Sequence, residues 1–142
     1  MTRRIEVNST VNALDDVMAF VDGSLKGMDV SRKSVLQLEL AVEEIFVNIA
    51  NYAYHTEGGK VWISCDVDAE DRSVAITFMD TGPEFDPLAA PDPDVTLPAD
   101  QRRIGGLGIF LVKTNVDNMS YKRLDGYNVL TIEKNLARYT QR

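Results

Sequence analysis

The feature that most constrains the fold is a long and largely apolar segment, LELAVEEIFVNIANYAY, at residues 38–54. Apolar residues recur along it at steps of three and four, which places them in one stripe on an α-helix. This spacing predicts a helix that begins near Ser31, a residue suited to cap it, and reaches about Tyr54, with the stripe in the core. The stripe consists of Leu38, Val42, Ile45, Ile49 and Tyr52.

A second row on the same helix carries two polar residues, Glu44 and Asn48, which lie one turn apart. Apolar residues flank this row, so little of the helix is left to face water. A buried amide without a partner costs about 2 kcal/mol or more, and a buried carboxylate without a partner is also costly. Two interpretations stay open: the row faces solvent where the helix emerges, or it lines a polar cavity whose occupant supplies the missing partners.

The rest of the chain alternates between α and β patterns and shows no internal repeat. Its 142 residues, 44% of them hydrophobic, are enough for one domain with a sizeable core. We therefore predict a single α/β domain over residues 1–142. Strands are expected at 4–10, 60–67, 73–80, 120–124 and 127–134, and further helices at 11–25 and 107–119.

One long segment interrupts this alternation. Residues 81–106, TGPEFDPLAAPDPDVTLPADQRRIGG, hold all five prolines of the chain and have no sustained periodicity. Structureless loops longer than about 15 residues inside a compact domain are usually functional lids or disordered linkers. The proline and aspartate content of the segment predicts that it is disordered in the absence of a ligand.

Two segments with glycine flank the long loop. MDTGPEFDP places Asp80 at the end of an expected strand and Gly82 in the next turn, where a backbone can approach a ligand; a plain turn is the alternative. RRIGGLGIFLV places Gly105, Gly106 and Gly108 before a helix, whose free N–H groups and dipole attract phosphate; a flexible hinge is the alternative. The second segment has neither the third glycine of a dinucleotide-binding fingerprint nor the Gly-Lys-Ser/Thr of a P-loop.

Charge and composition narrow the classes of function. The net charge of −7 argues against a surface for nucleic acid or anionic membranes, because such surfaces need basic residues. No run approaches the roughly 20 apolar residues of a membrane helix. Cys65, the only cysteine, lies in an alternating strand pattern and is expected to be a buried free thiol. These features favour a cytoplasmic protein whose partners are proteins or small molecules.

The helix with Glu-x-x-x-Asn, the strand ending in Asp-x-Gly and the glycines before a helix follow one another in an order that resembles the Bergerat (GHKL) ATPase fold. The resemblance is to the small anti-sigma factor serine/threonine kinases in particular. AVEEIFVNIANYAY resembles their N box, DTGPEFDP their first glycine box, and GGLGIFLVKTNVDNMSY with NVLTIEK their second box and closing strands. The resemblance implies a two-layer α+β sandwich with a mixed, mostly antiparallel sheet and helices on one face. It also implies that ATP binds beneath a lid at about 83–106.

The resemblance also implies roles for individual residues. Glu44 resembles the catalytic carboxylate that accepts a proton from the attacking hydroxyl or water. Asn48 resembles the Mg²⁺ ligand, and one protein oxygen is adequate because Mg²⁺ commonly keeps several waters and binds substrate phosphates. Asp80 resembles the residue that accepts a hydrogen bond from the adenine amino group, with Gly82 giving it room. The nucleotide and its metal would then be the missing partners of the polar row.

The glycines and two arginines complete the implied nucleotide site. Gly105, Gly106 and Gly108 resemble the cradle of the triphosphate. Arg103, with Arg102 beside it, is a candidate to stabilise charge on the γ-phosphate; a solvated pair on the lid is the alternative.

The chain departs from the family pattern in the first glycine box, and it lacks the phosphoacceptor histidine of the related sensor histidine kinases. Glu84 stands where the first glycine box often has a second glycine, which puts the detailed turn there in question. His55 follows the N box but lacks the setting of a phosphoacceptor histidine, so a sensor histidine kinase is not expected.

The resemblance implies an ATP- and Mg²⁺-dependent protein serine/threonine kinase that phosphorylates a small antagonist protein and otherwise sequesters a sigma factor, as a homodimer. Phosphoryl transfer needs mainly positioning and charge stabilisation, which one carboxylate, one metal ion and a glycine cradle can supply. The alternative is an ATP-responsive protein-binding switch with little or no kinase activity, whose output is the conformation of the lid. Neither function involves direct contact with nucleic acid or a membrane.

Overall fold

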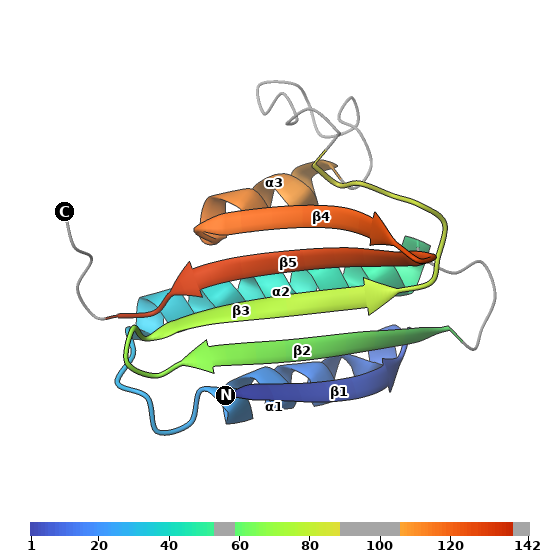
Figure 1. The fold of residues 1–142 in the computed structure, drawn as a ribbon. Coiled ribbons are helices and arrows are strands. Elements are labelled where there is room, and N and C mark those ends of the chain that lie inside the picture. The colour runs from blue at the N-terminus through green and yellow to red at the C-terminus, as the bar shows by residue number, and fades with distance from the viewer. Residues whose placement is uncertain (53–58, 89–105, 138–142) are drawn as a thin grey trace.

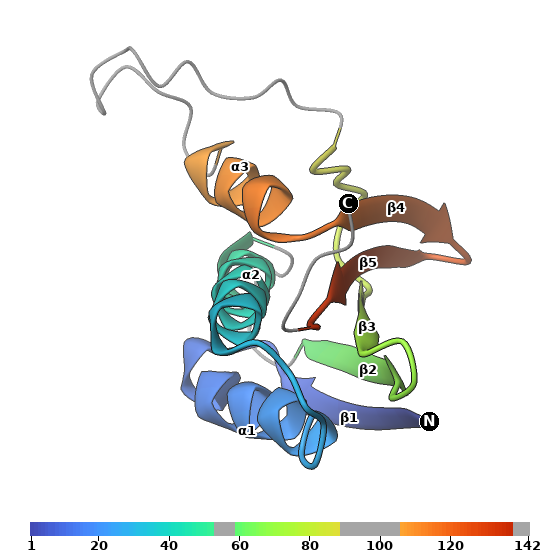
Figure 2. The ribbon, with the colours of Figure 1, turned by 90° about the vertical axis from the view of Figure 1, so that its left-hand side faces the viewer.

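The computed structural model describes residues 1–52, 59–88 and 106–137, which form two layers (Figure 1). In this described part, one layer is a five-stranded sheet in the order β1-β2-β3-β5-β4, and the helices form the other layer on one face of it (Figure 2). The strands are β1 (Thr2–Asn8), β2 (Lys60–Asp68), β3 (Ser73–Asp80), β4 (Asn118–Leu124) and β5 (Tyr127–Asn135). The helical elements are a 3₁₀ turn at Val11–Ala13, α1 (Leu14–Ser24), α2 (Arg32–Tyr52) and α3 (Gly106–Asn115).

The predicted two-layer α/β fold is confirmed. The sheet, expected to be mixed and mostly antiparallel, has only antiparallel pairings among the described strands. Alternate residues of β2 and β3 are buried, as the period-two pattern of their sequences predicts. Cys65 is a fully buried free cysteine on the core side of β2, also as predicted. Burial raises the pKa of its thiol above the usual value, so the thiol stays protonated and packs as a small apolar group.

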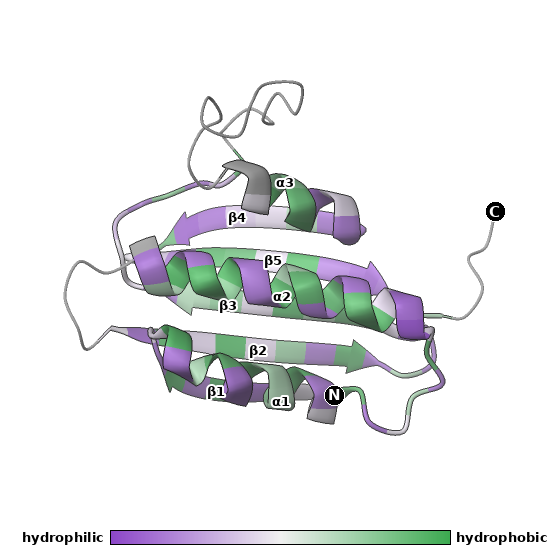
Figure 3. Ribbon diagram, turned by 180° about the vertical axis from the view of Figure 1, so that it is seen from behind, coloured by the Kyte–Doolittle hydropathy of each residue, from purple (hydrophilic) through white to green (hydrophobic). Residues whose placement is uncertain are grey.

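The central helix, α2, lies between α1 and α3 over the middle of the sheet (Figures 1 and 3). Its predicted core stripe is confirmed at Leu38 and Val42, which are 0% exposed, and at Ile45, which is 1% exposed. Ile49, farther along the stripe, is half-buried and packs against the core. Figure 3 shows hydrophobic residues recurring along this helix between polar ones. Of the helices in the described ranges, none is both long and apolar enough to cross a membrane.

The third helix ends earlier than its sequence spacing predicts. The spacing extends it to residue 119, but α3 ends at Asn115. Asn115 Nδ2 donates a hydrogen bond to the carbonyl oxygen of Leu111 at 2.7 Å, as short polar side chains do where a helix stops. The N–H of Asp117 then donates to the carbonyl oxygen of Glu133 at 2.9 Å. Pairing with β5 therefore ends the helix, and this contact lies far away in the sequence.

The sheet face opposite the helices carries an aromatic pair. The rings of Trp62 and Tyr127 meet edge to face, with centroids 5.8 Å apart and planes at 72°. Trp62 Nε1 also donates a hydrogen bond to Glu6 Oε1 at 2.8 Å. These contacts join β1, β2 and β5 on the outer face of the sheet.

Candidate functional site

The segments singled out by the sequence meet at one end of the molecule. The C-terminal part of α2, the end of β3 and the beginning of α3 lie at this end in both views of the sheet (Figures 1 and 3). Glu44 and Asn48 belong to α2, Asp80 ends β3, and Gly106 begins α3. The fold thus gathers residues from three separate segments of the chain.

Helix α3 approaches α2 through Gly108. A Cβ atom at Gly108 would lie 2.8 Å from Oε2 of Glu44 and 3.8 Å from Nδ2 of Asn48. The first of these distances is shorter than real Cβ contacts, so a side chain at Gly108 would displace the carboxylate. The absence of a side chain there allows Glu44, Asn48 and the first turn of α3 to share one site.

The row of α2 residues that contains Glu44 is exposed at its N-terminal end and half-buried farther along the helix. Leu36 is 52% exposed and Leu40 is 39% exposed, so the apolar half of the row faces solvent. Glu44 and Asn48 are half-buried where α3 approaches. The polar half therefore lies beside the first turn of α3, partly covered and partly open to solvent.

Asp80 lies on the core side of the sheet and is only 5% exposed. Its Oδ1 atom accepts hydrogen bonds from the N–H of Gly82 at 2.9 Å and from Nδ2 of Asn128 at 3.0 Å. Within the described residues, both of these hydrogen bonds end on Oδ1, and no fully buried side-chain polar atom lacks a partner. Oδ2 is therefore not completely covered, although the side chain as a whole is largely buried. An accessible oxygen on a largely buried carboxylate is well suited to accept a hydrogen bond from a ligand.

Asn128, on the core side of β5, is a site residue that the sequence did not indicate. It is 7% exposed, and its Nδ2 donates to Asp80 Oδ1 and to the carbonyl oxygen of Pro83 at 2.9 Å. Its Oδ1 accepts from the Tyr121 hydroxyl at 2.6 Å and from the N–H of Phe85 at 3.3 Å. The available signal was an asparagine at a strand position where the alternation calls for an apolar residue.

Arg123 of β4 also bonds to the turn after β3. Its Nη1 donates to the carbonyl oxygen of Gly82 at 2.8 Å and to Asn128 Oδ1 at 3.2 Å. Burial, and then the nearby charge of Glu84, raise the pKa of the Tyr121 hydroxyl, so this hydroxyl remains a donor. The turn that lacks the second glycine is thus held by side chains from β4 and β5, while Glu84 is exposed.

The remaining predicted groups are only partly within the described chain. Gly106 and Gly108 lie in the first turn of α3, where backbone N–H groups have no partner within the helix. Gly105 and Arg103 lie outside the described residues. Arg102, His55 and most of the predicted lid, at 89–105, lie outside them as well.

The candidate site offers a metal ion few protein ligands. In the described ranges, no group of three or more histidine, cysteine, aspartate or glutamate side chains is arranged to hold a metal. Mg²⁺ usually keeps several waters and takes only one or two protein oxygens beside substrate phosphates. Asn48 lies next to Glu44 and the first turn of α3 with its Nδ2 atom toward Gly108, so it would supply such an oxygen with the amide turned over.

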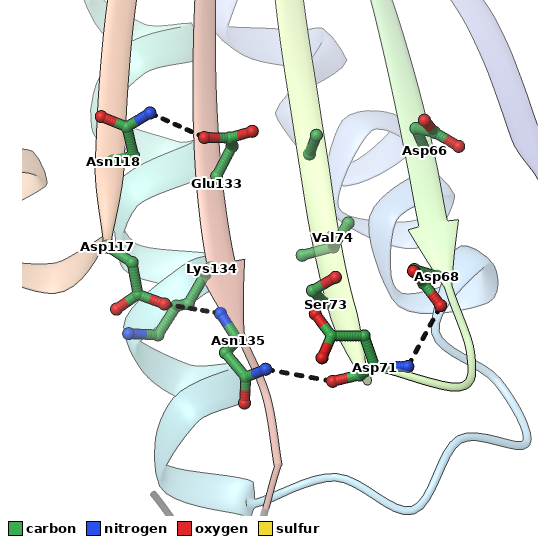
Figure 4. Close-up of a pocket in the computed structure, with 11 residues that line it drawn as sticks. Asp66, Asp68, Asp71, Ser73, Val74, Asp117, Asn118, Glu133, Lys134 and Asn135 are labelled. Atoms are coloured by element: carbon green, nitrogen blue, oxygen red, sulfur yellow. Dashed lines mark hydrogen bonds between the residues drawn. The ribbon is translucent and has the colours of Figure 1, made fainter. Parts of the chain in front are cut away.

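A groove of about 350 Å³ lies at the opposite end of the sheet (Figure 4). Its polar groups bond to one another: Asn118 Nδ2 donates to Glu133 Oε2 at 2.7 Å, and the N–H of Asn135 donates to Asp117 Oδ2 at 2.6 Å. The groove is separate from the end that holds Glu44 and Asp80. Its carboxylates belong to Asp66, Asp68, Asp71, Asp117 and Glu133.

Comparison with known proteins gives a family match and two kinase relatives. Residues 7–134 match the profile of the histidine kinase-like ATPase domain. The chain is 26% identical over 136 residues to the serine/threonine-protein kinase BtrW of Bordetella bronchiseptica, covering 96% of this chain and 95% of that protein. It is 31% identical over 122 residues to the serine-protein kinase RsbW of Halalkalibacterium halodurans, covering 83% and 73%.

Solved structures show the same fold. The RsbU and RsbW domains of a Mycobacterium tuberculosis protein superpose with a TM-score of 0.65 at 18% identity, covering 99% of this chain and 35% of that one. The histidine kinase domain of a blue-light activated histidine kinase from Erythrobacter litoralis superposes with a TM-score of 0.54 at 15% identity, covering 92% and 62%. The family match over residues 7–134, with RsbW as a relative, shows that this protein belongs to the histidine kinase-like ATPase domain family.

Proposed function

We propose that this protein is an ATP-dependent protein serine/threonine kinase that acts as an anti-sigma regulatory factor and phosphorylates a small antagonist protein. The observation that carries this proposal is the close approach of Gly108 to Glu44, which puts a carboxylate beside the first turn of α3. The curated relatives BtrW and RsbW are both named as kinases of serine or of serine and threonine, which supports the same reaction.

Glu44 is the residue that we assign to proton transfer. In the reaction, the oxygen of the acceptor hydroxyl forms a bond to the γ-phosphorus of ATP. The bond from that phosphorus to the bridging oxygen breaks, and ADP leaves with the electron pair. The hydroxyl proton passes to the Glu44 carboxylate as a general base. Glu44 is half-buried beside the first turn of α3, so a hydroxyl from another protein would approach the part of the carboxylate that is open to solvent.

Asp80 is the residue that we assign to the base of the nucleotide. Its accessible Oδ2 would accept a hydrogen bond from the adenine amino group, while Oδ1 stays bonded to Gly82 and Asn128. A carboxylate can only accept hydrogen bonds when it is ionised, so it favours a base that presents a donor.

The first turn of α3 is the part that we assign to the phosphates. The N–H groups of Gly106 and Gly108 and the positive end of the helix dipole attract anions. Gly105 and Arg103 would extend this cradle from the adjoining lid. Asn48 would give an oxygen to Mg²⁺, which offsets the charge of the phosphates when it is bound.

Calorimetric titration with ATP, with and without Mg²⁺, tests the nucleotide site. We expect saturable binding that Mg²⁺ strengthens and that Asp80→Asn weakens by about tenfold or more, because the amide presents a donor to the adenine amino group. Asp66→Asn, at the far end of the sheet, is the matched control and should leave ATP affinity unchanged. Absence of ATP binding by the unaltered protein would contradict the proposal.

Phosphoryl transfer to a copurifying protein, measured with γ-labelled ATP, tests the role of Glu44. Glu44→Gln should lower the transfer rate by about 10²–10⁴-fold, because the amide cannot take the proton. ATP affinity should stay within about threefold, since the shape is kept. Glu43→Gln, at an exposed position of the same helix, should change neither quantity. Undiminished transfer in Glu44→Gln would rule out this role.

The same experiment separates the kinase from an ATP-responsive protein-binding switch. A switch would bind its partner in an ATP-dependent way and leave no phosphoserine or phosphothreonine on it. The kinase leaves a phosphorylated partner whose affinity for this protein differs from that of the unmodified form.

We further infer that the protein works in the cytoplasm as a homodimer and sequesters a sigma factor when the antagonist is not engaged, thereby regulating transcription. This inference is supported by the relationship to RsbW and by the resemblance of the motifs to anti-sigma factor kinases. Light scattering gives the mass of the assembly in solution. Copurification of a sigma factor in the presence of ATP, and its release by the antagonist, tests the sequestration.

A further inference from the structure

We propose that Asn128 is a positioning residue for base selection: it holds Asp80 so that Oδ1 is bonded to the protein and Oδ2 alone is presented to the amino group of the base. The inference rests on the proposed function, because it takes ATP as the ligand of this site. It adds a residue of β5 to a site that the sequence places on β3, α2 and the glycine segments.

The hydrogen bonds of Asn128 fix the orientation of its amide. Both hydrogens of Nδ2 have acceptors, Asp80 Oδ1 at 3.0 Å and the Pro83 carbonyl oxygen at 2.9 Å. A flipped amide would bring its oxygen against these two acceptors, so one orientation alone satisfies the site. The opposite side of the amide meets donors only, from Tyr121, Phe85 and Arg123.

The fixed amide in turn fixes the carboxylate of Asp80. Oδ1 accepts two hydrogen bonds, from Gly82 and from Asn128, which come from different segments of the chain. Rotation of the carboxylate would break at least one of them while the side chain is largely buried, and such losses are costly. The side chain therefore presents the same oxygen, as an acceptor, to any bound base.

Loss of the Asn128 amide would remove this constraint but keep the charge of Asp80. The N–H of Gly82 remains as a donor, so the carboxylate can turn and share its two oxygens between the turn and solvent. The affinity for a nucleotide whose base has an amino group should then fall, because Asp80 accepts the hydrogen bond less well. The affinity for a nucleotide without that amino group should change little. The signature of positioning is thus a fall in base selectivity, and a general loss of folding would weaken both nucleotides equally.

The test compares ATP with purine riboside triphosphate, which lacks the amino group, by calorimetry on the full chain. The unaltered protein should bind ATP about tenfold or more tightly than the analogue. Asn128→Ala should shrink this ratio by about fivefold or more, through weaker binding of ATP. Asn135→Ala is the matched control, because Asn135 is an exposed asparagine on the same strand and donates to Asp71 at the far end of the sheet.

A second variant keeps the shape of the side chain and guards against loss of folding. Asn128→Asp replaces the donor facing Asp80 with an acceptor once both carboxyl groups are ionised, so selectivity should be lost at alkaline pH. It should return as the pH falls and the introduced carboxyl takes up a proton that it can donate to Asp80, because two neighbouring carboxylates hold one proton tightly. Equal weakening of both nucleotides, or an unchanged ratio in both variants, would overturn the positioning role. Failure of the unaltered protein to bind ATP would overturn the proposed function as well.

Discussion

Gly108 of α3 lies so close to Glu44 of α2 that a Cβ atom on the glycine would be 2.8 Å from the carboxylate oxygen Oε2. The backbone at Gly108 is ordinary helix, and the positive φ angles of the described glycines occur at Gly27 and Gly126. Glycine is therefore required at this position because any side chain would occupy the space of the Glu44 carboxylate, and not because of the backbone conformation.

Gly108→Ala should separate folding from catalysis. Alanine is favoured over glycine inside a helix by about 0.5–1 kcal/mol, so the melting temperature should stay equal or rise. The added methyl group would displace the Glu44 carboxylate, and a misplacement of about 1 Å can lower a rate by about 10²-fold. Thermal unfolding and phosphoryl transfer are measured together. Gly23→Ala in α1 is the control, and transfer at the unaltered rate in Gly108→Ala would show that Glu44 is not displaced or does not act.

A pair of carboxyl groups makes stability depend on pH. A hydrogen bond with Asp22, followed by burial and by the charge of Asp22, raises the pKa of Glu39 from 4.5 to about 7, while Arg32 opposes the shift. The folded protein then holds the proton more tightly than the unfolded chain. The resulting stabilisation is complete below the unfolded pKa of 4.5 and is lost as the pH rises through about 7.

Glu39→Gln should remove this pH dependence. Because Glu39 is partly exposed, we expect the variant to be more stable than the unaltered protein by only about 0.5–1 kcal/mol above neutral pH, and equal to it in acid. Urea unfolding at about pH 5 and about pH 8.5 measures the difference. Glu43→Gln, exposed on the same helix, should show no comparable trend. A difference that is the same at both pH values would contradict the assigned pKa.

Phe46 anchors α2 in the core. Its side chain is 0% exposed and is among the largest that are fully buried in the described chain. Phe46→Ala should lower the free energy of unfolding by about 3–5 kcal/mol, because it leaves a cavity that the core fills only in part. Leu40→Ala, at a position 39% exposed, should cost much less. Chemical denaturation of the two variants checks this order, and similar losses would place Phe46 outside the core.

The aromatic pair on the outer sheet face should contribute a measurable coupling. Because Trp62 and Tyr127 meet edge to face, a double-mutant cycle with leucine at each position should give about 0.5–1.5 kcal/mol beyond the single losses. Urea unfolding of the four proteins provides the numbers. Additive losses would mean that the two rings do not interact in solution.

The sequence predicts the parts of the fold that are encoded locally. The stripe from Leu38 to Ile45 repeats with the helix period, and that period reports burial directly. The sequence spacing extends α3 to residue 119, beyond its observed end at Asn115. Pairing of Asp117 with β5 determines this end, and the local sequence pattern does not indicate such pairing. Sequence spacing thus identifies elements well and their ends poorly where tertiary contacts compete.

The residues of the candidate site that lie in local motifs could be predicted from the sequence, and those defined by tertiary contacts could not. Glu44, Asn48 and Asp80 were indicated by motifs, since each motif lies within one segment. Asn128 was missed, because its bonds reach residues from the turn after β3 and from β4, and no short pattern contains them all. The roles assigned to Gly105 and Arg103 stay predictions, as both lie outside the described residues.

The hydrogen bonds of Arg123 have a thermodynamic consequence. Arg123 belongs to β4, an edge strand of the sheet, and yet it bonds to Gly82 and Asn128 next to Asp80, the carboxylate that we assign to the base. A protein that docks on this edge and draws Arg123 away would change the affinity for nucleotide. Linkage requires the nucleotide to change the affinity for that protein by the same factor. Through the hydrogen bonds of Arg123, the proposed nucleotide site and this edge of the sheet would thus be coupled in binding free energy.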